Sequence, residues 1–303
     1  MYAMKSICMK VRHSSVFQNA FVLLASAVLA GGCTVLKEPA PDTLIAHRGH
    51  VSLSKTHPTP PENTLASFQD AVDSGFGFEC DIIYTKDKRV FTTHDGCFKR
   101  CFGIDNENYK GMTWDYVSKL VPIDSSGVRH SDTRVALFEE VCALARDGRW
   151  IFVELKTDPE IVPLVRDILR RQTNANPQNL AFITFHPDTL KAVKQALPEY
   201  KAMLLLYSRK AWPHKKVKSE AERAPYTAEE CLEKLRACGA DGLDFHYDRT
   251  LTEQGPAFVK AIRDAGYEFH YWTIDRPEDA RKAFANGALS VTTNHPKDIL
   301  LDR

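Results

Sequence analysis

The sequence lacks several features that define common functional classes. Its 303 residues carry 40 Lys and Arg against 39 Asp and Glu, so no excess charge of one sign is available to attract nucleic acid or an anionic membrane. Its 8 cysteines include no Cys-x-x-Cys pair, which leaves a zinc or redox motif unsupported. No internal repeat or low-complexity tract is present, and nothing implies a protein partner. The function must therefore reside in a local site.

The N-terminal segment also lacks a run long enough to span a bilayer, because its apolar stretch covers only Phe21–Ala30. A basic head with Lys5, Lys10 and Arg12 precedes this run, and small residues lead from it to Cys33. This order predicts a signal peptide of the bacterial lipoprotein type over residues 1–32, with Cys33 lipidated, followed by a tether over residues 33–42. Plain secretion and an uncleaved membrane anchor remain alternatives. We expect an exported, lipid-anchored protein on the periplasmic or extracellular face of the cell envelope.

Export makes disulfides permissible. Beyond Cys8 and Cys33, the cysteines are Cys80, Cys97, Cys101, Cys142, Cys231 and Cys238. Cys80 and Cys142 are expected to be buried thiols. A bridge between Cys97 and Cys101, four residues apart in a predicted loop, remains open.

From residue 43 onward, short apolar runs alternate with amphipathic segments. The predicted strands are 44–47, 78–83, 89–94, 150–155, 180–185, 202–207, 242–245, 268–273 and 289–293. The predicted helices are 64–74, 137–146, 159–172, 187–196, 228–238, 253–265 and 277–285. Alternation at this spacing predicts parallel strands joined by helical crossovers, and so many strands in one domain favour a (β/α)8 TIM barrel over residues 43–303.

Three stretches depart from the alternation. Only Lys86-Asp87-Lys88 separates the second and third runs, too short for a crossover helix, so a hairpin is expected there. Residues 95–133 are polar and irregular, and we interpret them as an insertion covering the C-terminal mouth of the barrel. Residues 208–227 form a second irregular and basic stretch, interpreted as a solvated loop.

Chemically versatile side chains cluster where the predicted strands end. His47 and Arg48 follow the first strand, Glu79 and Asp81 lie on the second, His94 ends the third, and Glu154 and Lys156 end the fourth. Residues two apart on a strand point to the same side, and the C-terminal strand ends of a barrel meet at one mouth. The sequence therefore predicts one site that gathers all of these groups.

The residue types indicate the chemistry of this site. Three gathered carboxylates repel one another unless they are protonated or bind a cation, and oxygen ligands suit a hard ion, Ca²⁺ or Mg²⁺. Such an ion beside Arg48 and Lys156 makes a site for a singly charged phosphate group. His47 and His94 can then act as base and acid on opposite sides of phosphorus. Phosphodiester cleavage requires these parts.

The ordered motifs resemble the glycerophosphodiester phosphodiesterase family over about residues 43–300. They are Ile45-Ala46-His47-Arg48-Gly49, Pro61-Glu62-Asn63-Thr64, Glu79-x-Asp81, His94-Asp95, Glu154-x-Lys156, Thr184-Phe185, Trp272-Thr273 and Thr292–Pro296. Each motif alone is weak, but the ordered set is specific. The chain departs from the family pattern at Asn294, where Asp is common, and in a longer stretch between Gly49 and Pro61.

The resemblance implies a role for each site residue. It makes Glu79, Asp81 and Glu154 the ligands of one divalent cation, and His47 and His94 the catalytic pair, with His94 the general acid. Arg48 and Lys156 hold the phosphate, and Trp272 packs against the small-alcohol end of the substrate. The implied reaction converts a small glycerophosphodiester to glycerol 3-phosphate and an alcohol.

Other readings remain open. Related substrates include lysophospholipids, phosphoinositides and wall-polymer diesters, and a non-catalytic lipoprotein that captures phosphodiesters is an alternative from another class. We expect Glu62 to be a structural partner of the site rather than a ligand, and Asn63 or Thr64 to cap the first helix.

Overall fold

The computed structural model describes residues 42–50, 60–94, 98–105, 108–210, 216, 219–251 and 255–302. Residues 1–32, Cys33 and most of the tether lie outside this part, so the predictions made for them remain predictions. Parallel strands close into a barrel because β1 pairs with both β2 and β9. The strands are β1 Leu44–Ala46, β2 Gly77–Tyr84, β3 Val90–Thr92, β4 Ile151–Leu155, β5 Leu180–Thr184, β6 Lys201–Leu206, β7 Gly242–His246, β8 Glu268–Trp272 and β9 Ser290–Thr293. The predicted (β/α)8 barrel is confirmed.

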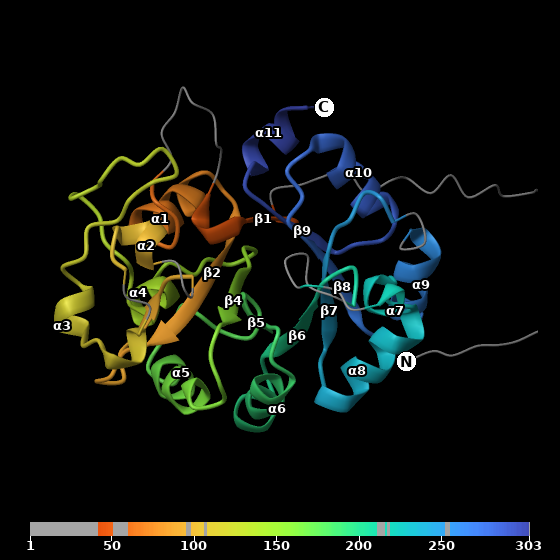
Figure 1. The fold of residues 1–303 in the computed structure, drawn as a ribbon, viewed down its shortest axis with the longest axis horizontal. Coiled ribbons are helices and arrows are strands. Elements are labelled where there is room, and N and C mark those ends of the chain that lie inside the picture. Colours follow the sequence, from red (N-terminus) through yellow and green to blue (C-terminus); the bar gives the residue numbers. More distant parts are fainter. Residues whose placement is uncertain are drawn as a thin grey trace, which may run out of the picture. The chain divides into compact units, whose positions relative to one another are not determined.

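Helices connect consecutive barrel strands and lie around the sheet (Figure 1). The crossover helices are α1 Leu65–Asp73, α4 Phe138–Ala143, α5 Ile161–Leu169, α6 Pro187–Ala196, α8 Ala228–Cys238, α9 Pro256–Asp264 and α10 Pro277–Ala285. Further helical segments, which the sequence analysis did not anticipate, are η1 His47–Gly49, α2 Phe98–Phe102, η2 Tyr109–Gly111, α3 Trp114–Val117, α7 Glu220–Arg223 and α11 Pro296–Leu301. Among the residues described, no helix is both long and apolar enough to cross a membrane.

Local signals in the sequence start and stop these helices. Thr64 caps α1 in a capping box with Ser67, as predicted for one of the two candidate cap residues. Such a cap is worth about 1 kcal/mol of helix stability. Proline stands at the first turn of α6, α9, α10 and α11, where its missing N–H costs nothing. Gly239 ends α8 in the left-handed conformation with φ of 71°.

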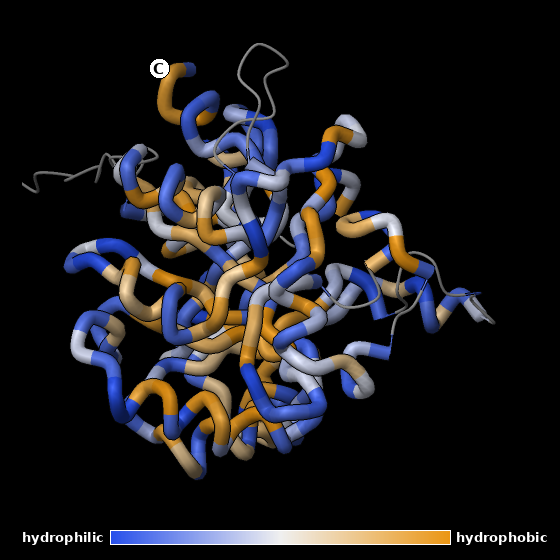
Figure 2. The backbone as a smooth tube through the Cα atoms, turned by 90° about the vertical axis from the view of Figure 1, so that its left-hand side faces the viewer, coloured by the Kyte–Doolittle hydropathy of each residue, from blue (hydrophilic) through white to orange (hydrophobic). Residues whose placement is uncertain are grey.

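Alternation along the strands separates two apolar layers. Side chains that point outward from the barrel pack against the helices in one large buried cluster. Those that point inward fill the barrel, as Phe152, Ile183, Met203 and Leu205 do. Figure 2 shows hydrophobic segments running through the middle of the backbone tube, and many hydrophilic segments at its periphery. The inward-facing positions nearer the C-terminal ends of the strands, beyond this apolar layer, carry the polar groups of the mouth.

The predicted hairpin is present: β3 runs antiparallel to β2 and lies outside the closed barrel. The described part of the 95–133 insertion packs on this hairpin in a separate apolar cluster that includes Ile83, Phe91, Phe98, Phe102 and Val117. The insertion therefore flanks one side of the mouth. Among the described residues, none of the side chains that line the mouth cavity comes from it.

The described cysteines lie in the core. Cys80, Cys142, Cys231 and Cys238 are buried free thiols, as expected for Cys80 and Cys142. Burial raises the pKa of each of these thiols, which makes them unreactive. Cys97 lies outside the described residues, so the question of a bridge to Cys101 stays open.

Candidate active site

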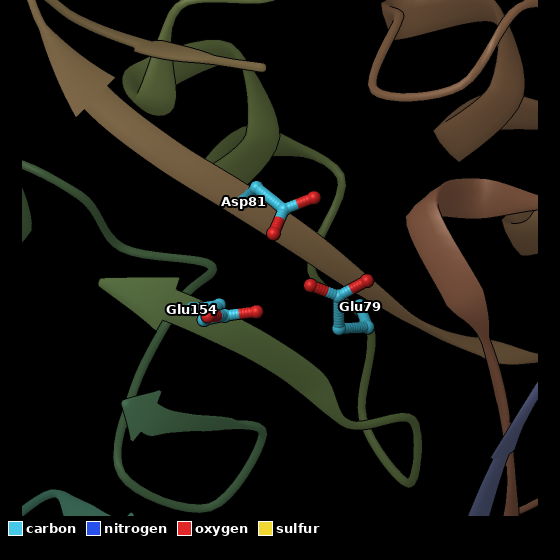
Figure 3. A group of neighbouring side chains, drawn as sticks. All are labelled: Glu79, Asp81 and Glu154. Carbon is cyan, nitrogen blue, oxygen red and sulfur yellow. The ribbon is translucent and has the colours of Figure 1, made fainter. Parts of the chain in front are cut away.

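Three carboxylates converge at the mouth, as predicted. Glu79 and Asp81 point inward from β2, and Glu154 points inward from the adjacent β4, where it is the register partner of Asp81. Figure 3 shows the three groups turned toward one another, and one oxygen of each lies within 4.8 Å of the others. All three side chains are nearly excluded from solvent. Their proximity is set by the register of two parallel strands.

Their electrostatics are unequal. Burial, followed by the charges of Asp81 and Glu154, raises the pKa of Glu79 above its ordinary value. Burial and the charge of Asp81, opposed by Lys156, raise the pKa of Glu154 to about 7. Burial also acts to raise the pKa of Asp81, but Lys156 and Arg48 outweigh it and hold that pKa well below the usual range. The cluster by itself therefore stabilises one full negative charge and resists two more.

This cluster fits a divalent cation. Glu79 Oε1 is buried and has no hydrogen-bond partner among the described residues. A buried carboxylate oxygen without a partner costs about 1–3 kcal/mol. A hard cation bound by the three carboxylates removes this cost and the repulsion together, and the all-oxygen donor set favours Ca²⁺ or Mg²⁺.

Two positively charged side chains, those of Lys156 and Arg48, lie against the carboxylates. Lys156 Nζ is 2.9 Å from Glu154 Oε1 and 3.5 Å from Asp81 Oδ1. Arg48 Nε is 3.4 Å from Asp81 Oδ2, and the Arg48 backbone N–H donates to Glu79 Oε2 at 2.9 Å. Arg48 adopts a left-handed backbone with φ of 55°, which aims both its amide and its guanidinium at the site. Arg48 and Lys156 both line the mouth cavity.

Glu62 lies beside this cluster rather than in it. Its carboxylate accepts from Arg48 Nη1 at 2.9 Å and from both terminal nitrogens of Arg100 on α2. Burial acts to raise the pKa of Glu62, but Arg100 and Arg48 lower it to about 2. Glu62 is thus a structural partner, as expected, and it ties the insertion to Arg48.

A hydrogen-bond chain fixes the ring of His47. Asn294 Nδ2 donates to Asp275 Oδ2 at 2.9 Å, so Asn294 Oδ1 is left to accept from His47 Nδ1 at 2.8 Å. His47 therefore carries its proton on Nδ1, and its unprotonated Nε2 faces Glu79 Oε2 at 4.0 Å. Burial, then the charge of Arg48, lowers the pKa of His47 to about 3. The ring is neutral at physiological pH, as a general base must be.

His94 is paired differently. Its Nε2 lies 3.1 Å from Lys156 Nζ. An ammonium group only donates, so His94 Nε2 accepts in this arrangement. His94 also lines the mouth cavity, as predicted.

The mouth encloses a cavity of about 510 Å³ with two unlike sides. The charged side comes from η1, from β2, from β4 and the residue after it, and from the chain after β3. The opposite side, from β5 to β8, is apolar and aromatic apart from His186 and Asp244, and Trp272 forms part of it as predicted. Trp272 makes edge-on contacts with Phe185, Tyr207 and His246 at ring-centroid distances of 5.6, 5.2 and 5.1 Å.

Several residues of the site escaped the sequence analysis. Asp244 on β7 lines the cavity with no motif around it, and Asp275 orients Asn294 from a loop 19 residues away. His186 also lines the cavity, and His246 contacts the rings of Tyr207 and Trp272 on its aromatic side. The signal that marks Asp244 is its inward-facing position on a barrel strand. That position can be recognised only once the pairing register of β7 with its neighbours is known.

In a comparison with protein families, the model of the glycerophosphoryl diester phosphodiesterase family matches residues 47–298 of this chain. A curated mouse protein named lysophospholipase D is 25% identical over 280 residues, covering 84% of this chain and 85% of its own.

Solved structures with the same fold include two bacterial proteins. A phosphodiesterase of Oleispira antarctica in complex with sn-glycerol 3-phosphate has a TM-score of 0.66 at 21% identity, covering 86% of this chain and 95% of its own. A glycerophosphodiester phosphodiesterase of Thermotoga maritima has a TM-score of 0.62 at 23% identity, covering 86% and 98%. At these identities the likeness establishes the barrel fold.

Proposed function

The chain belongs to the glycerophosphoryl diester phosphodiesterase family, and on that premise we propose that it hydrolyses glycerophosphodiesters to glycerol 3-phosphate and a free alcohol. One observation carries the proposal: a three-carboxylate cluster, Arg48, Lys156 and two histidines line or border a single cavity. The product bound by the Oleispira protein is in line with this assignment.

Binding of the phosphate is assigned to the charged side of the cavity. Glu79, Asp81 and Glu154 would hold one divalent cation, Ca²⁺ or Mg²⁺, which withdraws electron density from phosphorus and neutralises charge. Arg48 and Lys156 would donate to phosphate oxygens. Arg48 is positioned for this by Glu62, and Lys156 is positioned by Asp81 and Glu154.

The two histidines divide the proton transfers. His47 has an unprotonated Nε2 and a ring held by Asn294, which supports its role as base toward water or toward a hydroxyl of the substrate, the latter giving a cyclic phosphate first. His94 is the general acid for the departing alcohol. Lys156 donates to His94 Nε2 before substrate binds. A phosphate that draws Lys156 away frees that nitrogen to take up a proton from solvent, which His94 then passes to the oxygen of the departing alcohol.

A second substrate class has one supporting observation. Ile183, Phe185 and Leu205 give the cavity an apolar side, which suits an acyl chain, and the mouse relative is named for action on lysophospholipids. The capture of diesters without hydrolysis, by contrast, predicts the loss of a catalytic group, and the full set is present.

We further propose that the protein is exported and anchored by a lipid on Cys33, on the pattern of residues 1–33. Metabolic labelling with a radioactive fatty acid tests this: label is expected on the wild-type protein and absent from Cys33→Ser. Label that persists in Cys33→Ser would reject the anchor.

The hydrolytic function is tested by release of glycerol 3-phosphate from a panel of glycerophosphodiesters and lysophospholipids. Activity is expected to vanish with EDTA and to return with Ca²⁺ or Mg²⁺. His94→Ala and Glu154→Gln are expected to lower kcat by at least about a hundredfold. His130→Ala, in the insertion and outside the cavity, serves as the matched control and should retain full activity. Hydrolysis unaffected by EDTA and by both site variants would refute the proposal.

A further inference from the structure

The 95–133 insertion has no role so far at the active site, because none of its described side chains lines the mouth cavity. One of them nevertheless reaches a partner of the site. Phe98 and Phe102 of α2 are buried in the apolar cluster on the β2–β3 hairpin. This packing holds the backbone of α2 in place, and Arg100 extends from it to the carboxylate of Glu62.

Arg100 and Arg48 bind the same carboxylate in different ways. Arg100 Nη1 donates to Glu62 Oε2, and Arg100 Nη2 donates to Glu62 Oε1 at 2.7 Å. These two parallel bonds make a bidentate pair. Arg48 donates from Nη1 to Glu62 Oε1 at 2.9 Å, sharing that oxygen with Arg100. Arg100 therefore occupies the bidentate position on Glu62.

This arrangement affects what Arg48 can offer to a ligand. The bidentate geometry uses both carboxylate oxygens side by side, so Glu62 can accept only one arginine in this way. Without Arg100, Arg48 would be free to rotate onto Glu62 and form the two parallel bonds itself. Its guanidinium would then turn from the cavity and be neutralised by a whole carboxylate. With Arg100 in place, Arg48 keeps both its place in the cavity lining and donors for a phosphate oxygen.

We propose that Arg100 is a positioning residue for phosphate binding, which occupies Glu62 and thereby keeps Arg48 directed into the cavity. The inference rests on the proposed function, in which Arg48 donates to the phosphate of the substrate. It assigns no contact between Arg100 and the substrate. The insertion thus acts on the site through Arg48, from outside the cavity.

Binding of sn-glycerol 3-phosphate, measured by calorimetry with Mg²⁺ present, tests the inference without turnover. Arg100→Ala is expected to weaken this binding about fivefold, the upper end for a partly exposed ion pair. In hydrolysis, KM should rise by a similar factor while kcat stays within about twofold, because a phosphate contact is made in both the ground state and the transition state. Arg100→Lys keeps the charge but cannot form the two parallel bonds, so it should recover only part of the loss.

The decisive variant combines Arg100→Ala with Glu62→Gln. Glu62→Gln keeps one oxygen for Arg48 Nη1 and removes the second oxygen, so it cannot capture Arg48 in two bonds. The double variant should therefore bind glycerol 3-phosphate within about twofold of the wild type, and more tightly than Arg100→Ala alone. If Arg100 only tied the insertion to the barrel, Glu62→Gln would break the same tie, and the double variant would bind no better than Arg100→Ala.

Lys99→Ala is the matched control. Lys99 precedes Arg100 on α2 and pairs with Asp105 at the surface, so its loss should leave binding and hydrolysis unchanged. Thermal unfolding of each variant checks that the fold is retained.

The outcomes separate this inference from the hydrolytic function. Equal binding by the wild type and Arg100→Ala overturns the inference and leaves the function standing, as does full recovery in Arg100→Lys or no recovery in the double variant. If the wild type cleaves no diester, the function fails, and the calorimetric comparison of the same variants still decides the inference. A wild type that binds no glycerol 3-phosphate also overturns it, because Arg48 then holds no phosphate.

Discussion

The two ends of the barrel each contain a cavity lined by ionisable side chains, but the charges are arranged differently at each end. At the C-terminal mouth, like charges face one another and the pKa values of Glu79 and Glu154 rise. At the N-terminal end, a smaller cavity of about 210 Å³ is lined by Lys201, Glu268 and His270. There, burial acts to raise the pKa of Glu268, but its contacts with His270 and Lys201 lower it to about 2.

The difference identifies which end is built for a ligand. Charges of opposite sign lie together at the N-terminal end: Lys201 pairs with Glu268 and lies 5.4 Å from the Trp150 ring centroid, and Glu268 Oε2 lies 3.5 Å from His270 Nε2. Charges at the mouth are compensated only if a cation and a substrate arrive. Proteins commonly give up stability at functional sites in this way.

The largest effect is expected from Glu79→Gln at the mouth. The substitution keeps an oxygen for the Arg48 backbone N–H and removes one repelling charge. Hydrolysis should fall about a thousandfold, as when a preorganised electrostatic group is lost, while the melting temperature without added metal stays equal or rises. Steady-state kinetics and thermal unfolding measure both. A variant that is active, or one that is inactive because it unfolds, would break the comparison.

The next test of the comparison between the two barrel ends is the pH dependence of unfolding, measured on EDTA-treated protein. Burial raises the pKa of Glu154 from its ordinary 4.5 to about 7 in the folded state, so its stabilising contribution is complete below pH 4.5 and is lost as pH rises through 7. Burial of neutral His47 acts in the opposite direction, with a pKa of about 3 against 6.5, in wild type and Glu154→Gln alike.

The informative quantity is therefore the difference in unfolding free energy between wild type and Glu154→Gln. It should shift against the wild type by on the order of 2 kcal/mol between pH 5 and pH 8. Added Ca²⁺ or Mg²⁺ should abolish the shift. If the difference in unfolding free energy does not change between pH 5 and pH 8, the repulsion among the mouth carboxylates does not destabilise the fold.

The smallest effect is expected at the N-terminal end. Glu268→Gln should cost about 1 kcal/mol of stability, the scale of a partly exposed ion pair, and leave hydrolysis within about twofold of wild type. Denaturant unfolding and the glycerol 3-phosphate assay measure the two. Loss of activity with an intact fold would show that both ends serve catalysis.

Much of this architecture could be predicted from sequence, for identifiable reasons. Strand–helix alternation predicted the barrel, and the three-residue turn at Lys86–Lys88 predicted the β2–β3 hairpin. The shared direction of the Glu79 and Asp81 carboxylates could be predicted because residues two apart on a strand share a face. Their meeting with Glu154 followed from the adjacency of strand ends.

The remaining features depend on relations that the sequence does not display. Asp244 looks like any polar residue of a short strand, and its lack of a partner emerges only when every neighbour is placed. The orientation of His47 depends on Asn294 and, through it, on Asp275, which belongs to another loop. The short helices α2 and α3 span 5 and 4 residues, too few for an apolar period to be recognised.

The two cavities share one partition inside the barrel. Phe152 and Met203 line the N-terminal cavity, and Ile183 and Leu205 line the mouth cavity. All four belong to the inward-facing apolar cluster, so packed side chains separate the two cavities. A ligand can therefore reach the catalytic groups only from the mouth, and the barrel is a closed vessel with one usable opening rather than a channel.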